Sequence, residues 1–281
     1  MQLALSAFQT RMLREQGQNR DKFESNAKRT QIPKWLKSSD PEQNHKLSRS
    51  RHEPQTATWI LNMGKYQSWE NSRGQALWLH GIPGAGKTIL CSTIIDHIQT
   101  QFRDDQSTCV AYYYFDFAEK QKQTVLGLLK SLVYQLLCVS QPISDDAAAL
   151  YSNHQDGLEE PSPNELLELF LAEVGRVERV FILIDGLDEC PVDERQIFFS
   201  DFLKCLPPNA SLFITSRREP DIEATLGDAF SYTICIQSSF IDADVRTHVN
   251  SVMSRDPVLL RWKPAIREEI LESIVNGAHG M

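Results

Sequence analysis

The sequence lacks any apolar run close to the ~18 residues that a membrane-spanning helix needs. The opening "MQLALSAF" is too short for a secretory signal, and no basic residues precede its apolar part. The six cysteines stand singly, with no C-x-x-C spacing, and most lie in apolar runs, which predicts buried free thiols in a reducing compartment. These absences predict a cytoplasmic protein with no membrane partner.

The sequence also lacks the patterns typical of a histidine-based metal cluster or of a nucleic-acid-binding surface. The seven histidines form no H-x-x-x-H or H-E-x-x-H pattern, so no histidine-based metal cluster is expected. The net charge of −8 argues against nucleic acid as a partner, because a general nucleic-acid binder usually has a basic surface. What remains is a chain of 281 residues, long enough for one large α/β domain or two smaller domains.

Patterning divides the chain into four regions. They are a polar leader or connector helix, a flanking segment, an α/β domain and the start of a helical domain, at residues 1–31, 32–75, 76–239 and 240–281. In the flanking segment, Trp35, Trp59 and Trp69 stand among turn formers and are expected to pin it against the larger domain. Valines and isoleucines at helical spacing predict the last region, which we expect to be cut short where the chain ends at "GAHGM".

The third region alternates strands with helices, which indicates a parallel sheet with crossover helices. Strands are expected at residues 76–80, 109–117, 179–185, 210–216 and 232–237. Helices are expected after Thr88, over 125–137, from a capping box at Ser162 and Glu165, and around 193–206. Residues 140–161 are expected to form a polar loop. The predicted fold class is α/β, with three layers around a five-stranded parallel sheet of order 5-1-4-3-2.

The stretch "GIPGAGKT" (81–88) matches G-x-x-x-x-G-K-[ST], the pattern of a loop that wraps backbone N–H groups around phosphate oxygens. Lys87 can reach the β and γ phosphates, and Thr88 can offer its hydroxyl to Mg²⁺. A plain tight turn is the alternative, but the strand before the loop and the helix after it favour a P-loop NTPase fold. The residues predicted to bind nucleotide phosphates are Gly81, Ile82, Pro83, Gly84, Ala85, Gly86, Lys87, Thr88 and Ile89.

A second group of polar residues follows the buried strand in "FILIDGLDEC" (181–190). Asp185 ends that strand at the edge where α/β sheets bind ligands, and can hold Mg²⁺ together with Thr88. Asp188 and Glu189 return to the same edge, where one of them can orient or deprotonate an attacking water. A solvated acidic turn is the alternative. Two acids after the metal-holding Asp185 favour hydrolysis over transfer to a second substrate.

Arg217 follows the strand of "FITSRREP" and is expected to contact the γ-phosphate if that strand lies between the first and third. The alternative is a surface arginine that pairs with Glu219. The guanine-reading N-K-x-D motif of GTPases is absent, which favours ATP, although a GTP-preferring NTPase stays open. A nucleotide kinase would need an acceptor pocket and an arginine-rich lid, and the sequence shows no such pattern.

With "GIPGAGKT", "FILIDGLDE" and "FITSR" in this order, the chain resembles the NACHT group of STAND nucleoside triphosphatases. Its flanks are similar to the nephrocystin-like N-terminal NTPase region of fungal NLR-like proteins, over roughly residues 32–281. The resemblance implies a switch that is closed with ADP, opens with ATP and oligomerises, in non-self recognition and regulated cell death. It implies phosphate and Mg²⁺ binding by the glycine-rich loop, a metal ligand at Asp185, water positioning by Asp188 or Glu189, and a sensor at Arg217.

Two features depart from the relatives. Residues 55–58 read "QTAT" where relatives tend to carry a Gly-Thr-Gly turn, with Thr56 and Trp59 expected beside the base. The chain also ends before any winged-helix domain or sensor repeats. Two hypotheses therefore stand: a slow Mg²⁺-dependent ATPase that acts as a switch, or a nucleotide-dependent interaction module with vestigial hydrolysis. Of the protein partners that the resemblance implies, pairing with longer NLR-like proteins stays open, and self-association of this chain is expected to be weak at most.

Overall fold

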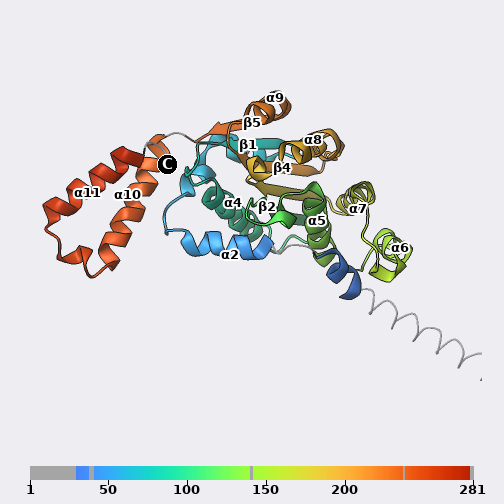
Figure 1. Ribbon diagram of the computed structural model, residues 1–281. Coiled ribbons are helices and arrows are strands. Elements are labelled where there is room, and N and C mark those ends of the chain that lie inside the picture. The colour runs from blue at the N-terminus through green and yellow to red at the C-terminus, as the bar shows by residue number, and fades with distance from the viewer. Residues whose placement is uncertain (1–29, 38–40, 140–141, 237, 279–281) are drawn as a thin grey trace, which may run out of the picture.

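A parallel sheet of five strands forms the centre of the computed structural model, which describes residues 30–37, 41–139, 142–236 and 238–278. The strands run in the order β2-β3-β4-β1-β5 (Figure 1). They are β1 (Ala76–His80), β2 (Thr108–Tyr114), β3 (Arg179–Asp185), β4 (Ala210–Ser216) and β5 (Tyr232–Cys235). Every pairing is parallel. The predicted order 5-1-4-3-2 is therefore confirmed, as is the place of the fourth strand between the first and third.

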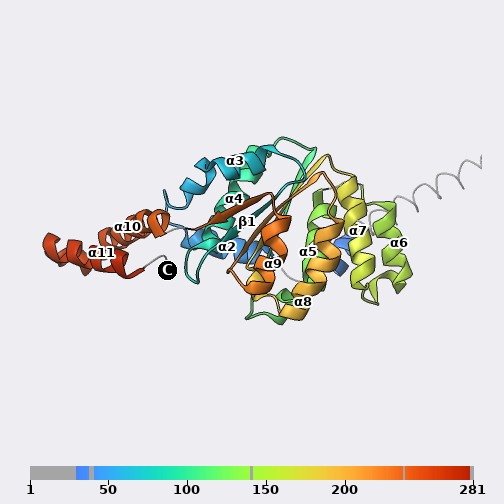
Figure 2. The same cartoon turned by 90° about the horizontal axis from the view of Figure 1, so that it is seen from above.

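Helices cover both faces of the sheet and make the three predicted layers (Figure 2). One face carries α2 (Pro41–Arg51), α3 (Gly64–Asn71) and α4 (Lys87–Gln101). The other carries α5 (Val125–Val139), α7 (Pro163–Gly175), α8 (Val192–Ile197) and α9 (Pro220–Ala229). The residues of β3 alternate between the two cores: Phe181 and Leu183 face one, Ile182 and Ile184 the other. The unbroken apolar run of this strand reflects burial on both faces.

Register brings the functional ends of the strands to one edge. Tyr114 pairs with Asp185, and His80 pairs with Ser216, which is the residue before Arg217. In parallel sheets the ligand site lies beyond these carboxyl ends. The glycine-rich loop after β1 and the acidic turn after β3 therefore lie at the same edge as the segment after β4.

The prediction of a polar loop over 140–161 is wrong for most of that range. It contains α6 (Asp145–Asn153) and a 3-10 turn over Gln155–Gly157. Ser144 caps α6 by accepting a hydrogen bond from the Ala147 backbone N–H at 3.0 Å, and Ala147 and Tyr151 are buried four residues apart. The two buried residues and the cap stabilise a helix whose sequence is otherwise polar.

Other boundaries differ less from expectation. The second strand ends at Tyr114 instead of residue 117, and the fifth ends at Cys235. The helix expected around 193–206 is α8 followed by a π-helical turn, Phe198–Leu203. The capping box of Ser162 and Glu165 is confirmed at the start of α7. All six cysteines are free, but only three are buried, because Cys138, Cys205 and Cys235 lie at exposed ends of their elements.

The flanking segment touches the domain through its three tryptophans. Trp69 is buried in α3 and donates to the carbonyl oxygen of Leu212 in β4, at 3.0 Å. Trp35 packs edge-on against Tyr151 of α6, with ring centroids 5.4 Å apart. Trp59, in the 3-10 helix Thr58–Asn62, donates a hydrogen bond to Asp244 of α10, the first of the two C-terminal helices described next. The predicted leader over 1–31 lies almost wholly outside the described residues.

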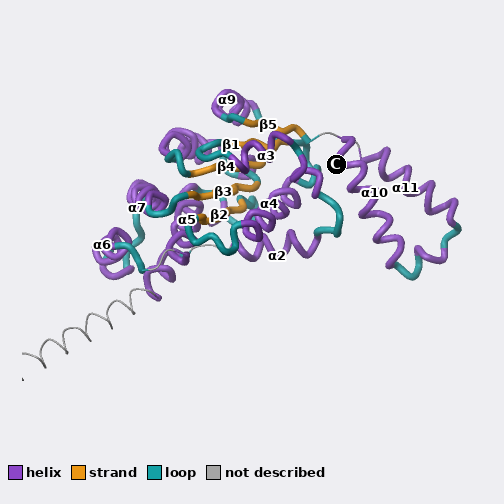
Figure 3. The backbone as a smooth tube through the Cα atoms, turned by 180° about the vertical axis from the view of Figure 1, so that it is seen from behind, coloured by secondary structure: helices purple, strands orange, loops and turns teal. Residues whose placement is uncertain are grey.

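Two further helices, α10 (Ser238–Arg255) and α11 (Pro264–Ala278), form a hairpin beside the sheet domain (Figures 1 and 3). A short 3-10 helix, Leu259–Arg261, lies between them. Arg246 of α10 pairs with Glu272 of α11 at 2.6 Å. Across the described ranges, none of the helices has the length and apolar character to cross a membrane.

Candidate functional site

The glycine-rich loop joins β1 to α4 in a conformation that depends on its glycines. Gly84 and Gly86 have φ angles of 78° and 79°, in the left-handed region that glycine adopts without a steric cost. A Cβ at Gly81 would lie 3.2 Å from Ile236 and 3.3 Å from Ala85, so the backbone is closely packed there. The loop opens α4 at Lys87, and the free N–H groups of the first turn face the loop's mouth.

Lys87 lies folded over this loop. Its Nζ donates to the carbonyl oxygens of Gly81 and Ile82, each at 3.0 Å. Burial lowers the pKa of the ammonium, whereas the carboxylates of Asp188 and Asp185 act in the opposite direction. The positive charge of Lys87 therefore lies between the glycine-rich loop and the acids that follow β3.

Asp185 is buried at the end of β3, with 4% of the residue exposed. Its Oδ1 accepts a hydrogen bond from Thr215 Oγ1 at 2.6 Å, and Thr215 in turn accepts from the Gly186 N–H at 3.0 Å. Burial raises the pKa of the Asp185 carboxyl, although hydrogen bonds from Thr215 and Thr88 favour the charged form. Thr215 was not among the predicted site residues. Its position at a strand end, two residues before Arg217, could have identified it as one.

The donor set fits Mg²⁺. The Thr88 hydroxyl and the Asp185 carboxylate line the same cavity beside the glycine-rich loop and offer oxygen ligands. Mg²⁺ is usually held by one or two carboxylates, with substrate phosphates and water completing its shell. In the described part of the chain no group of three or more histidines, cysteines or acids could hold a metal by itself. The site therefore suits a metal that arrives with a phosphate ligand.

Arg217 and Asp188 form one unit. Asp188 Oδ2 accepts from Arg217 Nε, and its Oδ1 accepts from the Arg217 backbone N–H, both at 2.9 Å. Asp188 has 4% of its side chain exposed, whereas 46% of the Arg217 side chain is exposed. The alternative pairing of Arg217 with Glu219 is wrong, because Glu219 accepts from Arg195 instead. Arg217 is thus held at its inner end while its outer part remains accessible.

Glu189 has the electrostatics of a proton acceptor near neutral pH. Gly186, at a φ of 72°, starts the tight 3-10 turn Leu187–Glu189 that brings this side chain back to the sheet edge. Its Oε2 accepts from the Phe117 backbone N–H at 3.1 Å. Burial, and then the charges of Asp185 and Asp188, raise the pKa of Glu189 to about 7. A carboxyl with this pKa can accept or release a proton at physiological pH.

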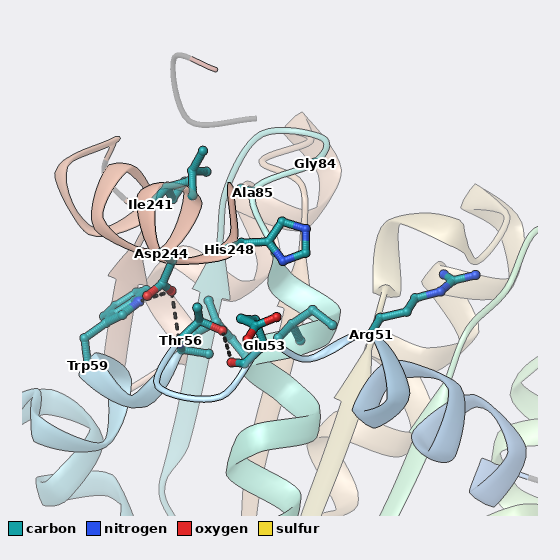
Figure 4. A pocket seen from close by; sticks show the side chains of 14 residues that line it. Arg51, Glu53, Thr56, Trp59, Gly84, Ala85, Ile241, Asp244 and His248 are labelled. Carbon is teal, nitrogen blue, oxygen red and sulfur yellow. Dashed lines mark hydrogen bonds between the residues drawn. The ribbon is translucent and has the colours of Figure 1, made fainter. Parts of the chain in front are cut away.

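Two cavities flank the glycine-rich loop. The phosphate cavity, of about 290 Å³, brings together Arg217, the predicted acids and the predicted loop residues from Pro83 to Ile89, whereas Gly81 and Ile82 are not part of its lining. It is lined by Pro83, Gly84, Ala85, Gly86, Lys87, Thr88, Ile89, Asp185, Gly186, Asp188, Glu189, Thr215 and Arg217. The nucleoside cavity, of about 280 Å³, lies on the other side and shares Gly84, Ala85, Gly86 and Ile89 with it. Thr56 and Trp59 line the nucleoside cavity, as does α10 (Figure 4).

Asp244 of α10 closes the nucleoside cavity. Its Oδ2 accepts from the Ala57 backbone N–H at 2.8 Å and from Trp59 Nε1 at 3.0 Å (Figure 4). A second pair of contacts lies nearby, where Glu53 accepts from Ser251 at 2.7 Å and from Arg255 at 2.8 Å. The hairpin is therefore tied to the flanking segment at the cavity. Asp244 was missed, since an acid on a helix carries no signal that it faces a tryptophan far away in sequence.

The "QTAT" departure has a structural consequence. Gln55 and Ala57 adopt φ angles of 73° and 58°, the left-handed region where residues with a Cβ are strained. Thr56 stabilises the turn, as its Oγ1 donates to the Glu53 carbonyl oxygen at 2.7 Å. The loop thus keeps a glycine-type conformation without glycines.

Comparison with known proteins bears on these residues. The family model described as "Nephrocystin 3, N-terminal" matches residues 55–217. This range contains every predicted site residue, from Thr56 to Arg217. The vegetative incompatibility protein HET-E-1 of Podospora anserina is 26% identical over 179 residues, which are 61% of this chain. The chain spans only 13% of that protein's length.

Solved structures are similar at a greater distance. CDC6P from Pyrobaculum aerophilum has a TM-score of 0.43 and 13% identity, covering 72% of this chain and 51% of its own. A Walker-type ATPase of Pyrococcus abyssi has a TM-score of 0.45 and 14% identity, covering 79% and 62%. Neither likeness bears on individual residues of the site.

Proposed function

The chain belongs to the family of the nephrocystin 3 N-terminal region, and we propose that it binds ATP with Mg²⁺ and hydrolyses it slowly, so that the bound nucleotide sets the position of the α10–α11 hairpin. The observation that carries the proposal is the pair of cavities on the two sides of one glycine-rich loop. One is polar and bounded by acids and a lysine. The other is bounded by Trp59, Ile89 and Val245 and suits a base and ribose.

Each residue then has a role. The loop amides, the first turn of α4 and Lys87 bind phosphate oxygens. Thr88 and Asp185 would hold Mg²⁺, which when bound neutralises charge on the phosphates. Glu189 accepts the proton of a water whose oxygen bonds to the γ-phosphorus, as the bond from that phosphorus to the ADP oxygen breaks. Asp188 holds Arg217, whose exposed end contacts the γ-phosphate.

The switch follows from the nucleoside cavity. Because Asp244 bonds both Ala57 and Trp59, a base beside Trp59 touches a junction between the flanking segment and α10. A ligand can shift a conformation only by its differential affinity for the two states. The similarity to HET-E-1, named as a vegetative incompatibility protein, supports a place for such a switch in non-self recognition, with self-association or pairing with longer relatives.

Calorimetry tests the binding proposal. Removing the charged contact of Lys87 should cost about 1.5–3 kcal/mol, or roughly tenfold to a hundredfold in affinity for MgATP and MgADP. Arg217→Ala should weaken MgATP binding more than MgADP binding, since its partner is the γ-phosphate. Equal affinities for wild type and Lys87→Ala would refute the phosphate site. A wild type that binds MgATP but releases no phosphate would support the interaction module instead, and tighter MgGTP binding would identify a GTP-preferring protein.

A further inference from the structure

Arg195 of α8 joins the two segments that carry the proposed catalytic groups. The residue is 3% exposed. On one side, its Nε and Nη2 donate to Asp221 at 2.8 and 3.2 Å, and Nη2 donates to Glu219 at 2.7 Å. On the other side, its Nη1 donates to the carbonyl oxygens of Asp188 and Cys190, at 3.1 and 3.0 Å. One guanidinium therefore binds the acidic turn after β3 and the start of α9.

These two segments meet again on the side of the phosphate cavity. The turn after β3 bears Asp188 and Glu189, and the segment after β4 bears Arg217. There Arg217 bonds the Asp188 carboxylate through its backbone N–H and its Nε. The turn is thus bound by Arg217 on the side of the phosphate cavity and by Arg195 through its backbone carbonyl oxygens.

We propose that Arg195 is a positioning residue for hydrolysis, which fixes the turn of Asp188 and Glu189 relative to the segment of Arg217. The inference rests on the proposed function, because the distance between Glu189 and Arg217 matters only if both act on a γ-phosphate. A displacement of about 1 Å among such groups can lower a rate on the order of a hundredfold.

The geometry of the Arg195 side chain, as well as its charge, suits it to hold the turn of Asp188 and Glu189 in place. Its planar fork offers N–H donors in fixed directions, whereas lysine has a single ammonium at the end of a flexible chain. Asp221 and Glu219 are each about one-third exposed, at 35% and 34% of the side chain, so both can remain hydrated when Arg195 is removed. In the described part of the chain Arg195 has no hydrogen bond to the glycine-rich loop. Its loss should therefore spare phosphate binding.

Hydrogen exchange of the nucleotide-free protein tests the support directly. In Arg195→Met, backbone amides over 186–190 and 216–219 should exchange at least about tenfold faster, while those of α5 should not change. Arg246→Met is the control, since Arg246 pairs with Glu272 outside both measured segments and its loss leaves the Arg195 contacts intact. Unchanged exchange at both segments would overturn the inference whether or not the protein hydrolyses ATP.

Kinetics test the consequence for hydrolysis. Arg195→Met and Arg195→Lys should both lower kcat at least about tenfold, with KM and MgADP affinity within about twofold of wild type. Adding Glu219→Gln and Asp221→Asn to Arg195→Met removes the unpaired acids and should restore thermal stability but not kcat. A lysine variant with wild-type kcat, or a triple variant that regains it, would overturn the positioning role. A wild type that neither binds nor hydrolyses ATP, with the expected exchange result, refutes the proposed function while the support by Arg195 stands.

Discussion

The phosphate cavity and the nucleoside cavity share one loop but draw their residues from different distances in the sequence. Around the phosphate cavity, each segment follows directly on a buried strand: the loop after β1, the turn after β3 and Arg217 after β4. Around the nucleoside cavity, the wall is made where residues 51–59 meet α10, and the bond from Trp59 to Asp244 spans 185 positions. The phosphate cavity is therefore determined by the sheet, whereas the nucleoside cavity depends on a contact between two peripheral elements.

The backbones of the two cavities differ in the same sense. The left-handed residues that line the phosphate cavity are all glycines, Gly84, Gly86 and Gly186, which adopt this conformation at no steric cost. The nucleoside cavity shares Gly84 and Gly86, and its other wall adds the turn of Gln55 and Ala57, which adopt the conformation under strain. We infer that the phosphate cavity is the rigid half of the site, and that the nucleoside cavity is the half where movement of the hairpin changes affinity.

The largest expected effect lies on the phosphate side. Glu189→Gln removes the proton acceptor while keeping the shape of the side chain, so kcat should fall by about 10²–10⁴-fold. MgATP affinity should change by less than about threefold, because proton transfer stabilises only the transition state. Single-turnover phosphate release and calorimetry measure the two. A variant that hydrolyses at the wild-type rate would remove Glu189 from the mechanism.

On the nucleoside side, Asp244→Ala should break the junction with α10. The Ala57 N–H and Trp59 Nε1–H lose their acceptor, at a cost of about 1–2 kcal/mol, or roughly tenfold in MgADP affinity. Affinity for magnesium pyrophosphate, which occupies only the phosphate cavity, should stay unchanged. Asp242→Ala, on the same helix but outside the cavity lining, is the control. If both ligands lose affinity equally, the two cavities are not separable.

The two cavities should also differ in how pH affects them, because hydrolysis depends on the protonation of Glu189 and nucleotide binding does not. Because the pKa of Glu189 is raised to about 7, its carboxyl retains a proton below that pH and cannot accept another. The value of kcat/KM for MgATP should therefore rise about fivefold between pH 6 and pH 7 and level off above pH 8. MgADP affinity should not follow this curve. A kcat/KM that is flat over this range would assign the proton to another acceptor.

The smallest effect concerns the strain of the nucleoside loop. Ala57→Gly should raise the free energy of unfolding by about 0.5–1 kcal/mol, since left-handed backbone costs alanine about 1–2 kcal/mol and the greater freedom of unfolded glycine offsets part of the gain. Ala147→Gly, the same substitution within helix α6, should lower it by about 1 kcal/mol. Urea denaturation measures both. Because both alanines are buried and each loses one methyl group, an Ala57→Gly variant destabilised as much as Ala147→Gly would show that the turn is not strained.

Several elements were determined by the sequence alone, because their causes are local. Unbroken apolar runs made β3 and β4 recognisable, and the register between parallel strands then brought Asp185 and Arg217 to one edge. The spacing of glycines and Lys87 specified the loop, and Ser162 with Glu165 specified the start of α7. In each case the residues that carry the pattern lie within a few positions of one another.

Other features were decided only by the tertiary structure. Arg217 bonds Asp188 while Arg195 binds Glu219, and this pairing depends on α8 and the segments after β3 and β4 lying together. The raised pKa of Glu189 comes first from burial, and then from the charges of Asp185 and Asp188 on its own segment and of Asp116 after β2. Helix α6 and the role of Asp244 depend on surfaces that meet far along the chain. Which side chains pair, and how far burial shifts a pKa, depends on which distant segments pack against one another. The spacing of residues along the sequence does not reveal those contacts.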